Sequence, residues 1–405
     1  MEWKEVTLGE VSSKIGDGLH GTPKYDDEGS YYFINGNNLN CGKIIIKDDT
    51  KRVGIEEFVK NQKELNEQTI LVSINGTIGN VAKYNNEPCI LGKSACYINV
   101  IKEVDKEFIY YILTSANFKR NITNEATGTT IKNVSLKQMR EYKFNIPCNI
   151  PDQRRIASIL SSLDRKIELN NKINAGLEEM AQAIFKNWFV DFEPFKDGKF
   201  VDSELGMIPE GWKVGTIGDI VEFQNGFTFS SKDFSENGEY KIITIKSVQD
   251  GCLVTEGSSK VTEYPTKMPA YCKLQSGDIL LSLTGNVGRC CLVTETNLLL
   301  NQRVAKIKAK ECYDNSFSYA LFRLKETKEL LISISRGTAQ ANLSPVEASK
   351  LPMVIPSEDA RKSFSMISDS IMNKIISIHI ENSRLSTLRD TLLPRLMSGE
   401  IEVPE

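Results

Sequence analysis

Two stretches of the sequence carry apolar residues at alternating spacings of three and four, the pattern of a long amphipathic helix. The first runs from Pro151 to Phe195, and Asn170 and Asn174 take two of its seam positions. Pro151 and Asp152 are a helix start signal, so a helix of roughly 37 residues, about 55 Å long, is expected. Its apolar seam positions are Ile156, Leu160, Leu163, Ile167, Leu177, Ala181 and Ile184.

The second stretch runs from Ser357 to Met397 and shows the same alternation. A single helix of this length cannot bury its own apolar stripe, so we expect the two helices to pair with each other as a coiled coil, with the buried asparagines fixing their register. The seam positions of the second helix are Phe364, Ile367, Ile371, Ile375, Ile378, Leu385, Leu388 and Leu392.

An internal duplication explains why there are two such helices. Matching residues recur at a constant separation of 209, for example 212 − 3 = 209 for the tryptophans, and the chain therefore reads as globule, long helix, globule, long helix. A linker rich in Pro, Gly and acidic residues follows the first helix at 191–211. The repeated pairs are Trp3 and Trp212, Leu71 and Leu280, Gly76 and Gly285, Gly79 and Gly288, Gly128 and Gly337, Asn133 and Asn342, and Pro147 and Pro356.

Each globule is predicted to be an α+β domain of about 150 residues, because short β-type runs alternate with Gly/Asn turns and one helical segment. The first globule is expected to have strands at Tyr31–Ile34, Thr69–Ile74 and Cys96–Ile101 and a helix at Lys106–Arg120. The second is expected to have strands at Lys241–Ile245, Asp278–Leu283 and Val304–Ala309 and a helix at Ser316–Glu329.

Composition narrows the class of protein. The chain has 405 residues, 40% apolar content and a net charge of -3, so a strongly basic nucleic-acid-binding protein is not indicated. Its nine cysteines form no CxxC pair, which favours reduced thiols in a cytoplasm. No stretch approaches the 18 or more apolar residues of a membrane helix, and a cytoplasmic location is expected.

None of the nucleotide-binding, metal-binding or catalytic motifs considered for this sequence is complete. Gly16, Gly18 and Gly21 match GxGxxG, but Thr22 and Pro23 follow where a dinucleotide fold needs a helix N-terminus. The segment 36–44 differs from a P-loop in length and ends without Ser or Thr. With two histidines and no Cys/His cluster, neither a zinc site nor a Ser/His/Asp set can be assembled. No catalytic residue and no metal ligand is predicted.

Nucleic-acid recognition is the stronger interpretation, because the loops are rich in short polar side chains and in isolated basic side chains. Asn and Gln can pair bidentately with adenine, and Arg or Lys with guanine. The alternative is that Asn, Gly and Thr simply form turns. In the first globule the candidates are His20, Thr22, Lys24, Tyr25, Asn35, Asn37, Asn38, Asn75, Thr77, Thr129, Thr130 and Lys132. In the second they are Asn225, Thr228, Ser230, Lys232, Lys246, Thr284, Asn286, Arg289, Gln302, Arg303, Arg336, Gln340 and Asn342.

The whole chain resembles the specificity (S) subunit of type I restriction-modification enzymes. The resemblance is strongest in the text of Pro151–Phe195, in the following SELGMIPEGW, and in the repeated turn segments Ser73–Gly79 and Ser282–Gly288. The second helix departs from the first by ending in RDTLLPRLMSGEIEV, which is similar to the usual C-terminal end of the family.

The resemblance implies an α+β fold with an internal pseudo-two-fold repeat. Two homologous target recognition domains of mixed α/β structure, at 1–150 and 212–356, are expected to be separated by two long helices that form an antiparallel coiled coil. The first spacer helix is expected at 151–195, a linker at 196–211, and the second spacer helix with a C-terminal tail at 357–405.

The resemblance also implies function and partners. The chain is expected to read a bipartite, asymmetric site in double-stranded DNA, with an unread spacer of roughly 5 to 8 base pairs by analogy with half-sites one helical turn apart. It is expected to bind no cofactor itself. Two methyltransferase (M) subunits bring S-adenosylmethionine, and restriction (R) subunits bring ATP and magnesium chemistry. Docking of partners is expected at Leu177, Met180, Phe185, Trp188, Phe189 and Phe192.

Other interpretations remain open at this stage. The aromatic residues before the linker can instead pack against the neighbouring globule. The chain can also be a stand-alone DNA-binding regulator or a non-catalytic scaffold. A fused adenine methyltransferase is excluded, because no Asn-Pro-Pro-aromatic or Asp-Pro-Pro-aromatic tetrapeptide occurs.

Overall fold

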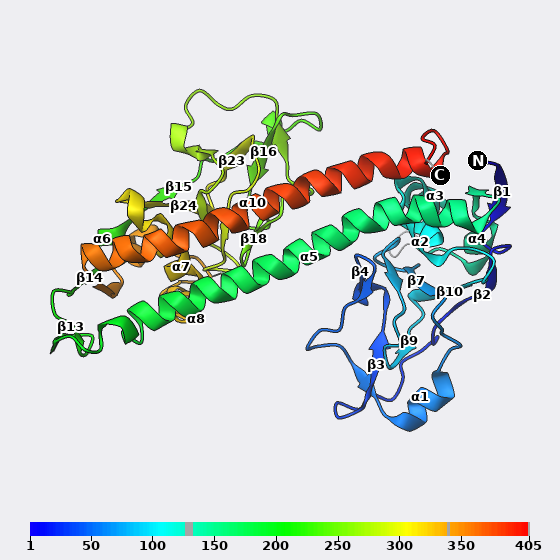
Figure 1. Ribbon diagram of the computed structural model, residues 1–405, viewed down its shortest axis with the longest axis horizontal. Helices are drawn as coiled ribbons and strands as arrows, with labels where there is room; N and C mark the ends of the chain where they lie inside the picture. The colour runs from blue at the N-terminus through cyan, green and yellow to red at the C-terminus, as the bar shows by residue number, and fades with distance from the viewer. Residues whose placement is uncertain (126–132, 338–340, 404–405) are drawn as a thin grey trace. The chain divides into compact units, whose positions relative to one another are not determined.

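The computed structural model describes residues 1–125, 133–337 and 341–403, and the chain divides into two compact units. Unit 1 comprises Met1–Ile167 and Leu385–Glu405, and unit 2 comprises Glu168–Arg384. Two helices of 40 residues each, α5 (Ile150–Phe189) and α10 (Glu358–Met397), contribute residues to both units (Figure 1). Each unit has its own sheets, short helices and apolar core.

Unit 1 combines small sheets with short helices. Its strands are β1 (Trp3–Thr7), β2 (Ser12–Asp17), β3 (Tyr31–Ile34), β4 (Leu39–Asn40), β5 (Lys43–Ile44), β6 (Arg52–Val53), β7 (Thr69–Ser73), β8 (Val81–Lys83), β9 (Cys89–Leu91), β10 (Ala95–Val100) and β11 (Lys143–Pro147). Its helices are α1 (Ile55–Asn61), α2 (Lys106–Thr114), α3 (Ala116–Glu125) and α4 (Leu136–Glu141). The central antiparallel sheet has the order β2-β10-β7-β8, a second sheet has the order β6-β3-β9, and β1 pairs with β11.

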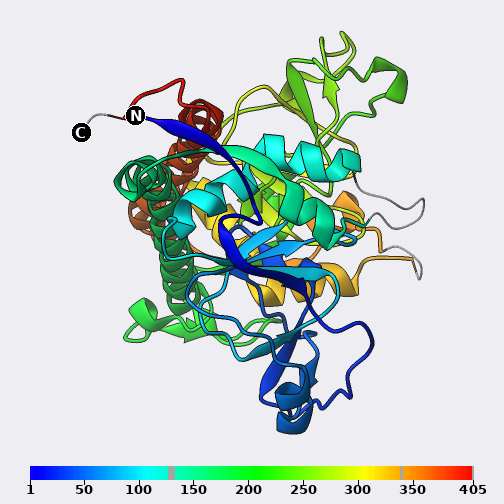
Figure 2. The ribbon, with the colours of Figure 1, turned by 90° about the vertical axis from the view of Figure 1, so that its right-hand side faces the viewer.

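The central sheet of unit 1 lies between two apolar cores, because successive side chains of a strand point to opposite faces. In β7, Ile70 and Val72 belong to the core that includes Phe108 of α2, whereas Leu71 belongs to a second core with Leu91. Figure 2 shows the cyan helices on one side of the blue sheet and α1 with the outer strands on the other. This two-sided burial explains why β10 is buried along its whole length.

Unit 2 repeats this architecture. Its strands are β12 (Phe200–Val201), β13 (Ile208–Pro209), β14 (Lys213–Thr216), β15 (Val221–Asn225), β16 (Tyr240–Ile243), β17 (Val248–Gln249), β18 (Cys252–Leu253), β19 (Lys260–Val261), β20 (Lys273–Leu274), β21 (Ile279–Ser282), β22 (Cys290–Leu292), β23 (Leu298–Leu300), β24 (Val304–Ala309) and β25 (Pro352–Ile355). Its short helices are α6 (Ile217–Ile220), α7 (Asn315–Arg323), α8 (Lys325–Ser333) and α9 (Pro345–Ser349). The central sheet has the order β15-β24-β21-β22, and the second has the order β19-β16-β23-β20.

The strands confirm the repeat predicted from the sequence. The separation of 209 takes the start of β8 to that of β22 (81 + 209 = 290), of β9 to β23 (89 + 209 = 298) and of β10 to β24 (95 + 209 = 304). The units differ at α1, because the described chain has no α-helix at the matching positions 264–270 of unit 2, where only a 3-10 turn begins at Ala270. The mixed α+β class is therefore confirmed, with one scaffold carrying different connections.

The long helices pack against each other in opposite directions within unit 2. Asn170 of α5 donates to Asn382 of α10, and Asn174, one turn further along α5, lies 3.5 Å from the carbonyl oxygen of Ile375, about two turns earlier in α10. At the C-terminal end of α5 and near the N-terminal end of α10, the ring centroids of Phe189 and Phe364 lie 5.0 Å apart. The contacts move forward along one helix and backward along the other, so the pair is antiparallel.

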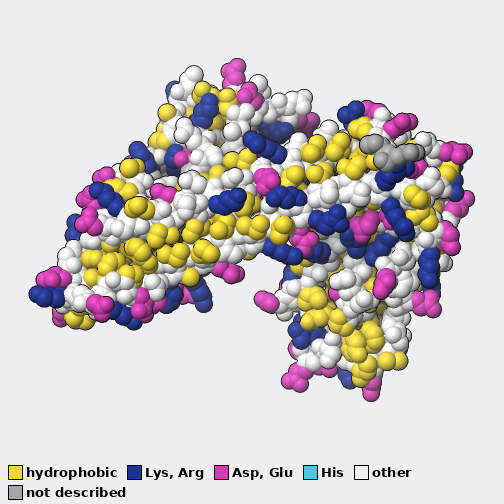
Figure 3. Space-filling view, in the orientation of Figure 1, with side chains coloured by type: hydrophobic (Ala, Val, Ile, Leu, Met, Phe, Trp, Pro, Cys, Tyr) yellow, Lys and Arg dark blue, Asp and Glu magenta, His cyan; other side chains and the backbone are white. Residues whose placement is uncertain are grey.

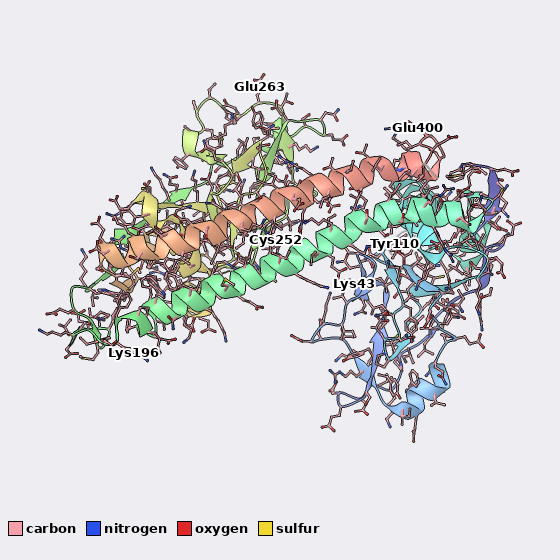
Figure 4. All side chains as sticks on the ribbon, in the orientation of Figure 1. Lys43, Tyr110, Lys196, Cys252, Glu263 and Glu400 are labelled. Atoms are coloured by element: carbon pink, nitrogen blue, oxygen red, sulfur yellow. The ribbon has the colours of Figure 1, made fainter. Side chains whose placement is uncertain are left out.

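Unit 1 fixes its own pair of helix segments by a polar cluster. Asp164 of α5 accepts hydrogen bonds from Arg389 of α10 at 2.8 Å and from the hydroxyl of Tyr111 in α2 at 2.7 Å. Burial, followed by the bond to Asp164, raises the pKa of Tyr111, so its hydroxyl stays a donor. The neighbouring Tyr110, labelled in Figure 4, packs against the β4–β5 turn, where a side chain at Gly42 would lie 2.7 Å from its hydroxyl.

Three details of the predicted helices were wrong. The first long helix ends at Phe189, because Phe192 has a left-handed backbone conformation (φ 55°) and a 3-10 turn follows at Glu193–Phe195. The helices predicted at Lys106–Arg120 and Ser316–Glu329 are each two helices. Ser115 breaks the first by taking an extended conformation and capping α3, whose Phe118 N–H donates to its hydroxyl at 3.2 Å.

The apolar positions predicted to form the buried seam of the second helix are not all buried. Ile367 and Leu388 are 42% and 47% exposed, whereas Ser368 is buried and hydrogen-bonded to Ser316 at 2.6 Å. A helix of 3.6 residues per turn rotates relative to a strict heptad repeat, so over 40 residues other positions turn toward the domain.

Candidate nucleic-acid interface

Three loops of unit 1 meet at one end of its central sheet. The β7–β8 loop (74–80) is tied to the β9–β10 turn (92–94), because the backbone N–H of Ile74 donates to the carbonyl of Ser94 at 3.0 Å. The Ser94 hydroxyl accepts from the N–H of Gly36 at 2.8 Å and donates to Asn35 Oδ1 at 3.0 Å. Ser94 therefore anchors the loop that follows β3 to the other two.

A fourth segment of unit 1 joins the same place through Asn133. Asn75 and Asn133 form an isolated antiparallel bridge, and the Asn75 amide donates to Asn133 Oδ1 at 3.4 Å. The exposed Thr77 lies in the same loop and its hydroxyl is 3.3 Å from that of the buried Ser73. We call the group formed by residues 35–37, 74–80, 92–94 and Asn133 the unit 1 cluster.

Unit 2 assembles the matching group from matching positions. Thr284 and Asn342 form an isolated antiparallel bridge, and their numbers follow from the unit 1 pair (75 + 209 = 284; 133 + 209 = 342). The N–H of Leu283 donates to the carbonyl of Arg303 at 3.0 Å, and Arg336 exchanges backbone hydrogen bonds of 3.0 and 2.8 Å with Asn342. We call residues 283–289, 301–303, 336–337 and 341–342 the unit 2 cluster.

Glycines set the shape of the matching loops. Gly76 and Gly285 have φ of 74° and 70°, and Gly79 and Gly288 have φ of 87° and 80°. These left-handed conformations cost other residues free energy, so glycine is needed where each loop turns back onto its sheet. The loops of both units consequently share a frame while their side chains differ, as is usual for recognition loops.

The charges of the two clusters differ. The unit 2 cluster carries Arg289, Arg303 and Arg336, and its described segments contain no carboxylate. At the positions that match the first two, unit 1 has Asn80 and Ser94, and its cluster carries the exposed Lys93 instead of an arginine. Guanidinium groups can bind guanine or phosphate, whereas amides pair with adenine, so the two clusters offer different hydrogen-bonding chemistry.

Several predicted DNA-contacting residues lie in these clusters. In unit 1 they are Asn35, Asn37, Asn75 and Thr77, and in unit 2 they are Thr284, Asn286, Arg289, Gln302, Arg303, Arg336 and Asn342. Thr228 joins the unit 2 cluster because its hydroxyl donates to Gln302 at 2.5 Å. Lys246 lies beside this cluster, because its carbonyl oxygen accepts a hydrogen bond from the amide of Gln249, which in turn accepts from Arg289. Four predictions, Thr129, Thr130, Lys132 and Gln340, fall outside the described residues.

The remaining predicted residues are exposed but lie on other segments. Tyr25 bridges to Val53 beside the second sheet of unit 1, and the N–H of Lys24 donates to Glu57 of α1 at 3.4 Å. His20 lies 2.6 Å from Asp17 at the end of β2. The others that the structure does not bring into a cluster are Thr22 in unit 1 and Asn225, Ser230 and Lys232 in unit 2.

Two predicted contact residues are buried. Asn38 supports its own loop, since its Oδ1 accepts from the N–H of Asn35 at 3.0 Å and its amide donates to the carbonyl of Ile45 at 3.1 Å. Thr284 is 8% exposed, and its hydroxyl has no hydrogen-bond partner among the described residues. The Asn38 side chain holds its own loop, and burial leaves little of either side chain accessible; their assignment as base contacts stays a prediction.

The sequence interpretation missed Ser94, Asn133 and Gln249. Two of them could have been found from the separation of 209, because Ser94 matches the predicted Arg303 and Asn133 matches the predicted Asn342. Gln249 gives no such signal. It lies in β17 and accepts a hydrogen bond from Arg289, which is 40 positions away in the chain.

The predicted docking residues divide into buried and exposed groups. Phe185 and Phe189 are 2% and 8% exposed in the core of unit 2, as in the alternative that these aromatic residues pack against the neighbouring globule, and their role in docking stays a prediction. Leu177, Trp188 and Phe192 pack partly against the same core. The burial is explained by the aromatic residues around them, which include Phe317, Phe364 and Trp212.

Met180 is 52% exposed, and it lies on a different face of α5 from these aromatic residues. Leu169 and Ile173 are also exposed, at 53% and 39%. Figure 3 shows apolar side chains gathered along this part of the molecule. We call Leu169, Ile173 and Met180 the α5 apolar surface.

Metal-binding groups and reactive thiols were the remaining candidate sites. They contain no group of three or more His, Cys, Asp or Glu side chains that could hold a metal ion. Burial raises the pKa of the Cys290 and Cys291 thiols, which disfavours a thiolate nucleophile.

None of the described helices combines the length and apolar character needed to cross a membrane.

Comparison with known proteins agrees with the geometry. The family model for the type I restriction modification DNA specificity domain matches residues 1–179 and 209–386. The MjaIX type I restriction enzyme specificity subunit of Methanocaldococcus jannaschii is 28% identical over 396 residues, covering 95% of this chain and 87% of the relative. The HindI specificity subunit of Haemophilus influenzae is 26% identical, covering 73% and 77%.

A solved structure shares the fold. The type I restriction-modification S subunit from M. genitalium superimposes with a TM-score of 0.57 at 20% identity, covering 98% of this chain and 96% of that one. Family model, relatives and fold all point to one group of proteins. The chain belongs to the family of type I restriction-modification DNA specificity subunits.

Proposed function

We propose that the chain reads a bipartite, asymmetric sequence in double-stranded DNA, each unit recognising one half-site with its cluster. The observation that carries this proposal is the pair of matching loop clusters on matching sheets, with three arginines in the unit 2 cluster and none in the unit 1 cluster as defined above. The same frame with different side chains supports two half-sites of different sequence. The chain itself catalyses no reaction in this proposal.

In the complex, two methyltransferase subunits methylate adenine with S-adenosylmethionine, and restriction subunits supply ATP- and magnesium-dependent cleavage. The α5 apolar surface supports docking of a methyltransferase subunit, because three large apolar side chains exposed on one helix are costly in an isolated chain. A net charge of -3 fits a reader whose partners supply further contacts to the phosphate backbone.

The first test is a map of methylated adenines in the DNA of cells that express the chain with and without its methyltransferase. We expect a split motif that appears only when both are present. Asn133→Ala should alter one half of this motif, and the matching Asn342→Ala should alter the other half. A motif that never appears, or a single variant that changes both halves, would exclude two independent readers.

The docking site has its own test. Met180→Asp should abolish methylation and prevent co-purification of the methyltransferase, because a charge cannot be buried in an apolar interface. Met366→Asp is the matched control, since Met366 is 83% exposed on α10 outside the α5 apolar surface. Normal methylation by the Met180 variant, or equal loss in both variants, would contradict docking at this surface.

The long helices are proposed to set the distance between the half-sites. Seven residues inserted after Ile167, with a matching heptad in α10, should lengthen the helix pair by about 10 Å. The unread spacer should then grow by about 3 base pairs, given 3.4 Å per base pair, while both half-sites stay the same. A change in the bases recognised would contradict the spacer role.

A further inference from the structure

Arg289 is held by its backbone at the end of the β21–β22 loop, where β22 begins. Its N–H donates to the hydroxyl of the buried Ser282 at 3.1 Å, and its carbonyl accepts from the N–H of Ser282 at 2.9 Å. Gly288, with φ of 80°, turns the chain immediately before it. The Cα of Arg289 is therefore placed by the scaffold, independently of its side chain.

The guanidinium group is also held. Its Nη1 donates to Gln249 Oε1, and Gln249 is itself fixed because its amide donates to the carbonyl of Lys246 at 2.8 Å. With its amide oriented so that the oxygen faces the guanidinium, Asn286 accepts from Nη1 and from Nη2, both at 3.2 Å. These bonds occupy both hydrogens of Nη1 and one hydrogen of Nη2.

One edge of the guanidinium remains open. A guanidinium has five N–H donors in a fixed plane, and after these bonds only the Nε hydrogen and the second Nη2 hydrogen are left. They point in parallel from the same edge. No described residue accepts from them, and neither nitrogen is among the buried unpaired atoms. Arg289 thus presents two parallel donors in an orientation set by the protein.

Guanine presents the complementary pair of acceptors in duplex DNA. Its O6 and N7 lie side by side at the edge of the major groove, where bidentate pairing with arginine is the commonest base-specific contact. Resting on the proposed function, we propose that Arg289 reads a guanine in the half-site of unit 2 through Nε and Nη2. Gln249 and Asn286 act as positioning residues.

The other two arginines of the unit 2 cluster serve as a comparison. Arg303 and Arg336 are exposed, and their guanidinium groups have no side-chain partner among the described residues. A guanidinium that no side chain orients suits phosphate contacts, which tolerate varied geometry, whereas reading a base requires a defined orientation. At the position that matches Arg289, unit 1 has Asn80 (80 + 209 = 289), so this contact belongs to unit 2 alone.

The test uses the full chain assembled with its methyltransferase subunits and duplexes that contain the mapped motif. Each guanine is replaced in turn by 7-deazaguanine, which lacks the N7 acceptor. Affinity should fall by roughly 10-fold at one guanine, in the half-site that Asn342→Ala alters. Arg289→Ala should bind the unmodified duplex roughly 10- to 100-fold more weakly and lose nothing further with 7-deazaguanine at that position.

The variants separate reading from folding and from charge. Arg289→Lys keeps the charge without the paired donors and should also lose the response to 7-deazaguanine. Gln249→Leu and Asn286→Ala should reduce that response while leaving the unfolding temperature of the complex close to that of the wild type. Arg303→Gln should keep the response fully and should lower the slope of log affinity against log salt by about 1.

Three outcomes would overturn the proposal. The first is a wild-type complex that is insensitive to 7-deazaguanine everywhere in the half-site of unit 2. The second is an Arg289→Ala variant that keeps its full sensitivity. The third is a uniform loss of affinity by Arg289→Ala with a shallower salt dependence, which would make Arg289 a phosphate contact. Absence of any methylated motif with the wild-type chain would instead refute the proposed function.

Discussion

The side-chain amide of Asn170 in α5 donates a 2.8 Å hydrogen bond to Oδ1 of Asn382 in α10, inside the helix pair of unit 2. Asn382 in turn donates to Asn171 at 2.9 Å, and Asn170 also donates to Glu381 at 2.9 Å. Asn170 is 1% exposed. A buried polar layer of this kind fixes the register of two helices, because a shifted pairing would leave its amides without partners.

The first prediction concerns this layer. Asn170→Ala leaves Asn382 without one donor and should lower the free energy of unfolding by about 1–3 kcal/mol. The double variant Asn170→Leu with Asn382→Leu removes both amides and should recover most of that loss. Urea unfolding of the three proteins checks this. Equal destabilisation by the single and double variants would show that shape, not pairing, matters here.

A second prediction compares two glycines. Gly76 has φ of 74° and open space where a Cβ would lie, so Gly76→Ala should destabilise through backbone strain alone, by about 1–2 kcal/mol. Gly176 lies within α5, and a Cβ there also meets nothing within 4 Å. Gly176→Ala should therefore stabilise by roughly 0.5–1 kcal/mol. Thermal unfolding should move the two variants in opposite directions; a shift of the same sign would contradict the conformational argument.

The polar cluster of unit 1 supports a third prediction. Tyr111 is 2% exposed and donates to Asp164, so Tyr111→Phe should reduce stability by about 0.5–1.5 kcal/mol. A double-mutant cycle with Arg389→Ala should show coupling, since both residues bind the same carboxylate. Lys186→Ala is the control, because its pair with Asp191 is exposed and should contribute less than about 0.5 kcal/mol. Additive effects in the cycle would argue against a shared cluster.

The fourth prediction concerns pH. Burial lowers the pKa of His379 in α10 below the usual histidine value of 6.5, although Glu178 acts in the opposite direction. The folded state then binds this proton less readily than the unfolded state, so stability falls as pH drops through about 6.5. His379→Gln should lose less thermal stability than the wild type between pH 7.5 and 5.5. Identical losses in both proteins would assign the pH dependence to other groups.

Periodicity and repetition in the sequence determined the architecture of this protein. The alternating apolar positions required two long helices, and the constant separation of 209 required two related domains, because both patterns follow from local geometry repeated along the chain. The separation also indicates which loops correspond, and so placed Asn75 and Thr284, or Asn133 and Asn342, at equivalent positions.

Only the tertiary structure decided which of these side chains are available. The sequence pattern predicts Phe185 as a docking residue, but its ring packs against Phe317 and Phe364. It predicts Asn38 as a base contact, but the Asn38 side chain supports its own loop. Arg289 is oriented by Gln249, a partner 40 positions away. Burial and hydrogen bonding depend on segments brought together by folding, and no spacing within a single segment specifies them.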